Sequence, residues 1–288
     1  MSAPVPPATE EIDPFVAGAF LTACRAELTA LKPGNVHVFA PGHRMTVGDF
    51  ERSAEAAAPF VARRGVRIGQ RIREAVTATR AAVGQNTNLG IVLLAAPIAR
   101  AFEIAEGPGR GKLRAALGRV LDDLDIQDAI DGFAAIRLAE PGGLGSADRH
   151  DVSHQPSASF RDAMAEAAAR DTIARAYVTG FADLFDPGLV SFERAVAQRG
   201  FGPAAITQLY FRFLAAFPDS HIVRKHGIVV AERVRQTAAD LQPRLAAGDA
   251  AAELIALDRS WKAASINPGT SADLTVATIF LHLIGCDK

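Results

Sequence analysis

Polar side chains interrupt the apolar pattern of this chain at five places, and the first is a turn at residues 32–37 (KPGNVH). Proline disfavours helical geometry in the residue before it, so the segment stops the preceding apolar stretch. The turn presents Lys32, Asn35 and His37 from one place, a set that suits phosphate oxygens. A plain helix stop with solvated side chains has the same composition, so both interpretations stand at this point.

A second polar cluster, Asn86, Thr87 and Asn88, leads directly into an apolar run. A single Asn or Thr at this place would cap the following helix. Three consecutive polar side chains exceed what one cap needs. The amino-terminal end of a helix also favours negative charge, so the segment predicts an anion-binding helix start.

A carboxylate stands on the apolar stripe of the helix expected at 159–185. At 100° per residue, Asp171 falls on the same face as Met164, Ala174 and Val178. An apolar site penalises a carboxylate unless it is paired or binds a metal. Asp171 therefore either pairs with Arg175, one turn further on, or points into a cavity lined by helices.

A second proline-glycine turn, residues 267–273 (NPGTSAD), precedes the last apolar run. Asp273 begins the stripe of that run and so faces the core. Thr270 and Asp273 also match a capping box, in which two side chains bond the backbone at a helix start. Thr46 and Asp49 match the same pattern. A capping role and a chemical role stay open for both aspartates.

The fifth cluster comprises Asp219, His221, Arg224 and Lys225. His221 and Lys225 lie one helical turn apart and could together reach a phosphate. An ordinary solvated helix face has the same charge pattern, so this cluster also carries two interpretations.

The elements that must position these groups are helices. Apolar periodicity, caps and proline stops predict them at about 14–31, 46–63, 69–83, 89–105, 112–121, 126–138, 159–185, 190–199, 203–216, 221–241, 248–263 and 271–284. No period-two alternation bounded by hairpin turns occurs, so no sheet is expected. The segment 89–105 is apolar on most sides, which predicts a central buried helix. We expect an all-α fold: one multi-helix bundle domain at 13–288, a disordered tail at 1–12 and a long loop at 140–157.

Composition narrows the function classes. The 288 residues carry a net charge of -1 and 49% hydrophobic residues, so neither nucleic acid nor a membrane surface is an expected partner. Cys24 and Cys286 stand far apart, which disfavours a cysteine zinc site and indicates a reducing compartment. The chain begins without a signal-peptide pattern, so we expect a cytoplasmic protein acting on small molecules. A homodimer is left open.

These segments together resemble the triphosphoribosyl-dephospho-CoA synthase family. The features that carry the likeness span about residues 15 to 284: residues 32–36 (KPGNV), Gly42-His43, Asp49-Phe50 with Ser53, Glu74, residues 86–90 (NTNLG), 142–145 (GGLG) and 267–274 (NPGTSADL). The resemblance implies an all-helical enzyme that cleaves ATP at its glycosidic bond and releases adenine. The triphosphoribosyl group goes to the 2'-hydroxyl of 3'-dephospho-CoA, giving the precursor of the prosthetic group of citrate lyase or malonate decarboxylase.

The chain departs from the pattern of the members that serve those lyases. They carry Asn-Thr-His-Lys-Gly where this chain has Asn88 and Leu89, and a second glycine where Thr270 stands. The chain is thus similar to a divergent branch found in organisms that make methanopterin-type one-carbon carriers. We therefore expect ATP binding to be retained better than the identity of the acceptor.

The resemblance also implies a role for each of these residues. Breaking the ribose–adenine bond builds oxocarbenium character, as in glycoside hydrolysis, and calls for carboxylates near the sugar. We expect Glu74, Asp49, Asp171 and Asp273 to be catalytic, and Asp171, Asp273 and Glu74 to hold Mg²⁺ on the phosphates. The expected ATP and phosphate contacts are Lys32, Asn35, His37, His43, Asn86, Thr87, Asn88, His221, Arg224, Lys225, Asn267, Thr270 and Ser271.

Two other functions are compatible with the same residues. The chain could transfer a ribosyl or phosphoribosyl unit to another acceptor in the synthesis of a methanopterin- or furan-type one-carbon cofactor. It could also be a nucleotide-binding helical protein without catalysis, which would bind ATP and release no adenine.

Overall fold

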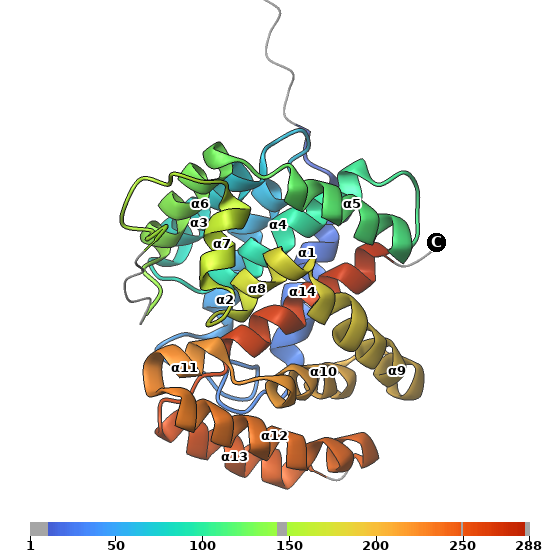
Figure 1. Ribbon diagram of the computed structural model, residues 1–288. Coiled ribbons are helices and arrows are strands. Elements are labelled where there is room, and N and C mark those ends of the chain that lie inside the picture. Colours follow the sequence, from blue (N-terminus) through green and yellow to red (C-terminus); the bar gives the residue numbers. More distant parts are fainter. Residues whose placement is uncertain (1–10, 143–148, 249, 286–288) are drawn as a thin grey trace, which may run out of the picture.

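The computed structural model describes residues 11–142, 149–248 and 250–285, and over these ranges the chain is helical (Figure 1). The helices of the first half are α1 (Pro14–Thr29), α2 (Val47–Val61), α3 (Ile68–Val83), α4 (Leu89–Ile104), α5 (Arg110–Asp122) and α6 (Ile126–Ala139). Those of the second half are α7 (Phe160–Ala167), α8 (Thr172–Thr179), η1 (Leu184–Leu189), α9 (Val190–Arg199), α10 (Pro203–Ala216), α11 (Ser220–His226), α12 (Ile228–Ala247), α13 (Ala251–Ala263) and α14 (Gly269–Gly285).

The prediction of an all-α fold is confirmed. Between residues 11 and 285, within the described ranges, extended pairing is limited to isolated bridges such as Ile12 with Arg63. The predicted boundaries of α1, α3, α4 and α10 agree with the structure to within two residues, because proline, glycine and cap residues mark those ends.

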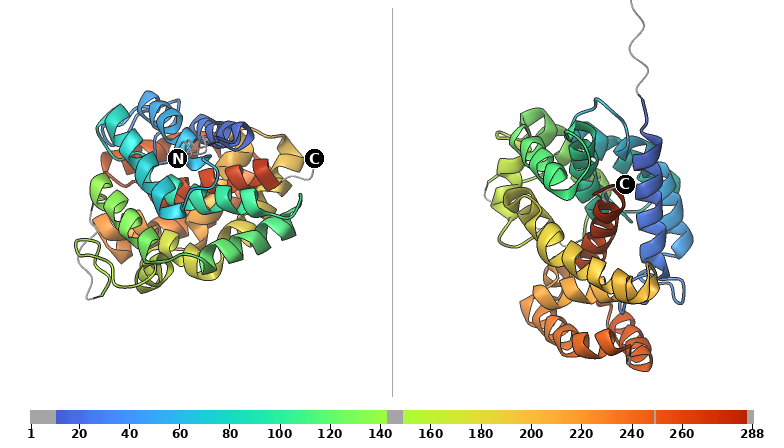
Figure 2. Two further views of the ribbon diagram at one scale, coloured as in Figure 1. Left: turned by 90° about the horizontal axis from the view of Figure 1, so that it is seen from above. Right: turned by 90° about the vertical axis from the view of Figure 1, so that its right-hand side faces the viewer.

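Two helices form the centre of the molecule. The predicted central helix, α4, is buried on most of its surface, from Leu89 to Ala101. The carboxyl-terminal helix α14 is equally covered and contacts α4, α1 and α10. Figure 2 shows α14, in red, passing through the middle of the molecule with α1, in blue, on one side. The structure therefore has two central helices where the apolar pattern predicted one.

A second layer lies below this core. Helices α10 to α13 gather at one end of the molecule (Figure 1). Their apolar side chains, among them Tyr210, Ile222 and Trp261, form a cluster separate from the main core. Trp261 packs near the turn at Gly34, so this layer supports the first proline-glycine turn.

Two predicted helices are broken in the structure, one at Asp171 and one at Gly227. The segment predicted as 159–185 divides into α7 and α8, because the Asp171 side chain accepts hydrogen bonds from the backbone of Ile173 and Ala174 and starts a new helix. The segment predicted as 221–241 divides at Gly227, whose φ of 81° ends α11. Each break creates an additional helix amino terminus.

Some expectations fall outside the described residues. The tail predicted to be disordered is 1–12, and residues 1–10 of it lie outside the described ranges. Residues 143–145 of the glycine-rich segment and Cys286 also lie outside them. Glu11 is described, and its carbonyl accepts a hydrogen bond of 2.8 Å from the Arg64 backbone. None of the described helices has the length and apolar character needed to cross a membrane.

Candidate active site

A cavity of about 480 Å³ lies where the amino-terminal ends of four helices meet. Residues that line it come from the starts of α4, α8, α11 and α14 and from the ends of α3 and α6. Its polar and charged lining comprises Glu27, Asn35, His43, Arg80, Gln85, Asn86, Thr87, Glu140, Asp171, His221, Arg224, Lys225, Asn267, Thr270 and Asp273. Helix amino termini carry partial positive charge, so the architecture favours an anion.

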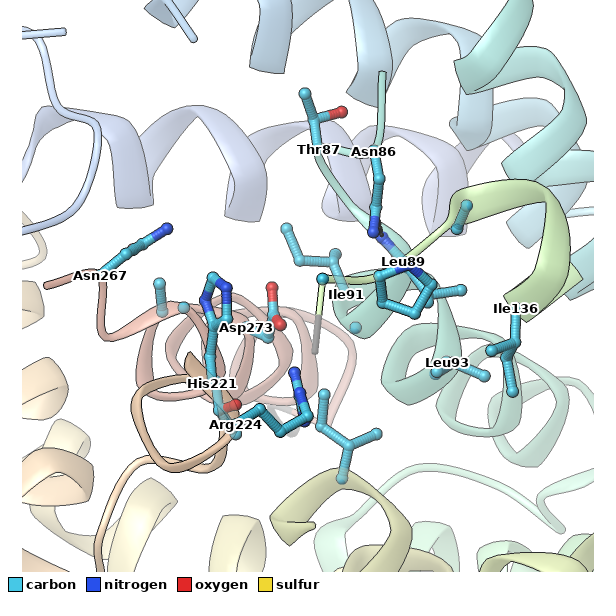
Figure 3. A pocket seen from close by; sticks show the side chains of 18 of the residues that line it. Asn86, Thr87, Leu89, Ile91, Leu93, Ile136, His221, Arg224, Asn267 and Asp273 are labelled. Atoms are coloured by element: carbon cyan, nitrogen blue, oxygen red, sulfur yellow. Dashed lines mark hydrogen bonds between the residues drawn. The ribbon is translucent and has the colours of Figure 1, made fainter. Parts of the chain in front are cut away.

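The structure thus brings together most of the residues predicted for the site. Each of the five polar clusters found in the sequence contributes at least one residue to the cavity lining. In chain order, these residues include Asn35, Asn86, Asp171, Arg224 and Asp273. Figure 3 shows Asp273 beside His221 and Arg224, with Asn86 across the cavity.

Among the carboxylates that line the cavity, Asp273 has the fewest polar contacts with the rest of the protein. No hydrogen bond or ion pair to its side chain occurs among the described residues. Burial raises the pKa of Asp273 well above its usual range, and the nearby acids Asp219, Glu27 and Asp171 contribute to the rise. A bound cation would reduce the repulsion among these carboxylates.

The capping box predicted for Asp273 is absent, because another aspartate occupies that role. Asp219 accepts hydrogen bonds from the backbone of His221 and Ile222 at the start of α11. Its second oxygen accepts from the backbone and hydroxyl of Ser271, at 2.7 and 2.8 Å, in the first turn of α14. One buried carboxylate therefore caps two helices, and Ser271 serves this bond instead of lining the cavity.

Asp171 is both a cap and a cavity residue. Its second oxygen accepts a hydrogen bond of 2.5 Å from Arg224. The proposed pair with Arg175 is wrong, because Arg175 bonds Asp183 at 2.8 Å once the helix is broken before it. The break turns Asp171 toward α11 and so toward the cavity.

Basic side chains come mainly from α11. Arg224 and Lys225 line the cavity, and the buried Arg224 Nε atom has no hydrogen-bond partner in the described part of the chain. His221 lines it too, and burial together with the charges of Lys225 and Arg224 lowers the pKa of His221 to about 3. His221 is therefore a neutral hydrogen-bonding group at physiological pH.

Two glycines make room for these side chains. A β-carbon at Gly269 would stand 2.4 Å from His221 Nδ1. A β-carbon at Gly90 would stand 2.1 Å from Asp273 Oδ2. Glycine at these two places lets the helix starts approach the site side chains directly.

The first proline-glycine turn contributes Asn35, not Lys32, to the cavity wall. The Asn35 amide donates a 2.8 Å hydrogen bond to Asn267 and so joins the two proline-glycine turns. Lys32 is fully buried behind it and pairs with Glu27. His43 also lines the cavity and bonds the Gly34 carbonyl at 2.7 Å.

Several predicted residues support the site through bonds to other parts of the protein, and two of them, His37 and Asn88, lie outside the cavity lining. His37 is buried, and its Nε2 lies 3.3 Å from Asp258 Oδ1. Thr87 lines the cavity and also bonds the Ser53 hydroxyl at 2.5 Å. Asn88 donates to the Ser53 carbonyl at 3.3 Å. These bonds fix the turns that carry Asn35 and Asn86.

Two predicted catalytic carboxylates lie away from the cavity lining. Asp49 forms the capping box with Thr46 at the start of α2, with bonds of 2.8 and 3.3 Å. Glu74 pairs with Arg63 and accepts a 3.0 Å bond from Gln70. The geometry gives Asp49 a capping role and Glu74 an ion-pairing role.

Sequence analysis missed Glu27, which lines the cavity from α1. A signal was present: Glu27 falls on the stripe of Val16, Phe20 and Ala23, where an unpaired carboxylate is costly. Arg80 and Glu140, which pair with each other at 3.1 Å at the cavity edge, were also missed. Their helices carry many similar exposed charges, so nothing in the sequence distinguishes these two.

The residues that line the cavity fit one kind of Mg²⁺ site, the kind in which the ion binds together with a nucleotide. The described residues contain no group of three or more potential metal-ligating side chains. Mg²⁺ that binds with nucleotides typically uses one or two carboxylates together with phosphate oxygens and waters. Asp171 and Asp273 on one cavity, with Asp273 lacking a cationic partner, provide such a donor set.

The fold and cavity define an all-helical protein with a charged small-molecule site formed by helix amino termini. The model of the ATP:dephospho-CoA triphosphoribosyl transferase family (CitG) matches residues 14–288. The chain belongs to this family, and it is a transferase that uses ATP.

A solved structure from Archaeoglobus fulgidus, provisionally described as a triphosphoribosyl-dephospho-CoA synthase, has a similar fold, with a TM-score of 0.63. It is 24% identical, and the similarity covers 81% of this chain and 96% of that one. At this identity the likeness supports the fold alone. No curated protein matches the chain.

Proposed function

We propose that the protein transfers the triphosphoribosyl group of ATP to the 2'-hydroxyl of 3'-dephospho-CoA and releases adenine. The observation that carries the proposal is the convergence of four helix amino termini on one cavity that also holds Arg224, Lys225 and Asp273. Helix amino termini and basic side chains are the groups that bind phosphate chains. Membership of the transferase family supports ATP as the phosphate-bearing substrate.

The triphosphate is assigned to the part of the cavity between α11 and α14. Arg224 and Lys225 supply positive charge there, and neutral His221 supplies a hydrogen bond. Asp171 and Asp273 would hold Mg²⁺, which neutralises phosphate charge when it is bound. Asn35, Asn86 and Asn267 add uncharged donors and acceptors around the same space.

The adenine base is assigned to the apolar wall. Ile91, Leu93, Ile136, Met164 and Ile173 line the cavity from α4, α6, α7 and α8. Purine rings gain from such a surface because ligand sites bind apolar groups on hydrophobic walls and orient them with few polar contacts. The sugar then lies between the apolar wall and the carboxylates, where its developing positive charge is stabilised.

Mass spectrometry of the product tests the transfer. Incubation with ATP, Mg²⁺ and 3'-dephospho-CoA should convert dephospho-CoA to a species heavier by one triphosphoribosyl group, and NMR should show the new glycosidic bond at the 2'-oxygen. A product bonded elsewhere would correct the position. Unchanged dephospho-CoA would refute the proposed acceptor.

One observation favours a second acceptor. Leu89 lines the cavity, and the family pattern described above has lysine at this position in the members that serve citrate lyase or malonate decarboxylase. An apolar side chain here would bind a less phosphorylated acceptor better, such as a hydroxyl compound of one-carbon cofactor synthesis. Equal assays with dephospho-CoA and with pterin or furan alcohols would decide, and Leu89→Lys should raise activity with dephospho-CoA if the side chain sets acceptor choice.

A further inference from the structure

Glu27 brings a second buried carboxylate to the cavity wall. It lies in the last turns of α1, is 4% exposed and lines the same cavity as Asp273. The two groups are close enough that the charge of Glu27 contributes to the raised pKa of Asp273. Glu27 therefore stands near the centre assigned to the sugar.

Its cationic partner, Lys32, is not part of the cavity lining. Lys32 has no exposed surface and does not line the cavity, so it has no route to a phosphate. Its ammonium group donates to Glu27 Oε1 and, at 3.3 Å, to Asn35 Oδ1. No donor reaches Glu27 Oε2 among the residues of the described ranges, which leaves one carboxylate oxygen for a ligand.

The other acids of the cavity are engaged differently. Asp171 accepts two backbone bonds and one from Arg224. Glu140 is exposed and pairs with Arg80. Asp273 lacks a cation partner, which suits a metal. Glu27 alone among these four combines burial, a directly bonded lysine and an oxygen without a protein donor.

We propose that Glu27 is the catalytic base that takes the proton of the acceptor hydroxyl, and that Lys32 is a positioning residue that holds Glu27 ionised and oriented. This proposal rests on the proposed transfer function. Burial raises the pKa of Glu27, and contact with Lys32 opposes the rise. A base held in this way gains strength from burial while its partner keeps it charged.

The step balances in atoms and charge. The bond from the ribose carbon to adenine breaks, and its electron pair leaves with adenine, which takes up one proton from cavity water. The acceptor oxygen bonds the same carbon, and its proton passes to the Glu27 carboxylate. Glu27 then returns that proton to water.

The test uses azide, which attacks carbon without losing a proton. Glu27→Ala should transfer to hydroxyl acceptors on the order of 10²- to 10⁴-fold more slowly than the wild type, the usual contribution of a general base. Azide should restore adenine release in this variant and yield the triphosphoribosyl azide. A purely structural role for Glu27 would not produce this rescue.

Removing Glu27 alone leaves the buried Lys32 ammonium without its partner, which can destabilise the fold. A second variant that lacks both charges avoids this. Glu27→Ala combined with Lys32→Met removes both charges and should show the same azide rescue. Glu55→Gln is the matched control, because Glu55 also pairs with a basic side chain, Arg25 at 2.8 Å, but lies exposed. It should keep full hydroxyl transfer and no azide dependence.

Two failures can be told apart. A wild-type enzyme that releases no adenine from ATP overturns the proposed function itself. The other failure starts from a wild type that does release adenine. If the Glu27 variants then transfer at the normal rate, or bind ATP without responding to azide, only the role of Glu27 is overturned.

Discussion

The α-carbon of Gly90 packs directly against the carboxylate of Asp273: a β-carbon on residue 90 would stand 2.1 Å from Asp273 Oδ2. The start of α4 and the second turn of α14 therefore approach each other at the site itself. This contact explains why residue 90, two positions after the polar run at 86–88, is glycine, and it links two segments that lie far apart in the sequence.

Gly90→Ala should displace the Asp273 carboxylate and lower kcat by roughly 10²-fold, since a shift of about 1 Å at a reacting centre can have that effect. Circular dichroism should show an intact helical fold. Gly118→Ala is the matched control, because a β-carbon there meets nothing within 4 Å. It should keep activity and stabilise α5 by about 0.5–1 kcal/mol. Normal turnover in Gly90→Ala would separate Asp273 from the chemistry.

Asp273→Asn should abolish turnover with little effect on the fold. The carboxylate has no hydrogen bond or ion pair within the described ranges, and removing its charge relieves repulsion from neighbouring acids. The thermal midpoint should stay equal or rise. Full activity in this variant, measured as adenine release, would contradict the assignment of Asp273 to the site.

Asp49→Ala should behave in the opposite way. Its side chain completes the capping box of α2, so we expect unfolding free energy to fall by about 1 kcal/mol while kcat and KM stay near the wild type. Urea unfolding and steady-state kinetics check both parts. A large loss of kcat without destabilisation would restore Asp49 to the catalytic set.

His221 predicts a specific pH dependence of stability. Its pKa is about 3 in the folded protein and about 6.5 when unfolded. Between these values the unfolded state binds the extra proton, so folding stability should fall as pH falls from 6.5 toward 3.

The His221→Asn variant isolates this contribution. His43 is also depressed by burial and contributes in the same direction, so the slope should flatten in His221→Asn without vanishing. Urea midpoints measured at several pH values test this, and an unchanged slope would contradict the burial of His221 as a neutral group.

The sequence predicted the helical fold and most cavity residues because turns, caps and apolar stripes are local signals. Asn35, Asn86 and Asp273 stand at breaks in that pattern. The split at Asp171 was missed because the residues before it, Ala163 to Ala168, continue a helical composition. Only the capping bonds to Ile173 and Ala174 reveal the new start.

Partner choice was the main failure, for a physical reason. Asp171 pairs with Arg224, 53 residues away, instead of Arg175. Lys32 pairs with Glu27 instead of facing the cavity. Asp219 caps α14 in place of Asp273. Each of these bonds depends on how helices pack, which local spacing does not encode.

Adenine release tests the central claim most directly. Purified protein is incubated with ATP and Mg²⁺, with and without 3'-dephospho-CoA, and free adenine is measured by chromatography. We predict adenine only when dephospho-CoA is present, in equal amount to the product formed. ATP that is bound but yields no adenine in either tube, or adenine formed equally fast without an acceptor, would contradict the account.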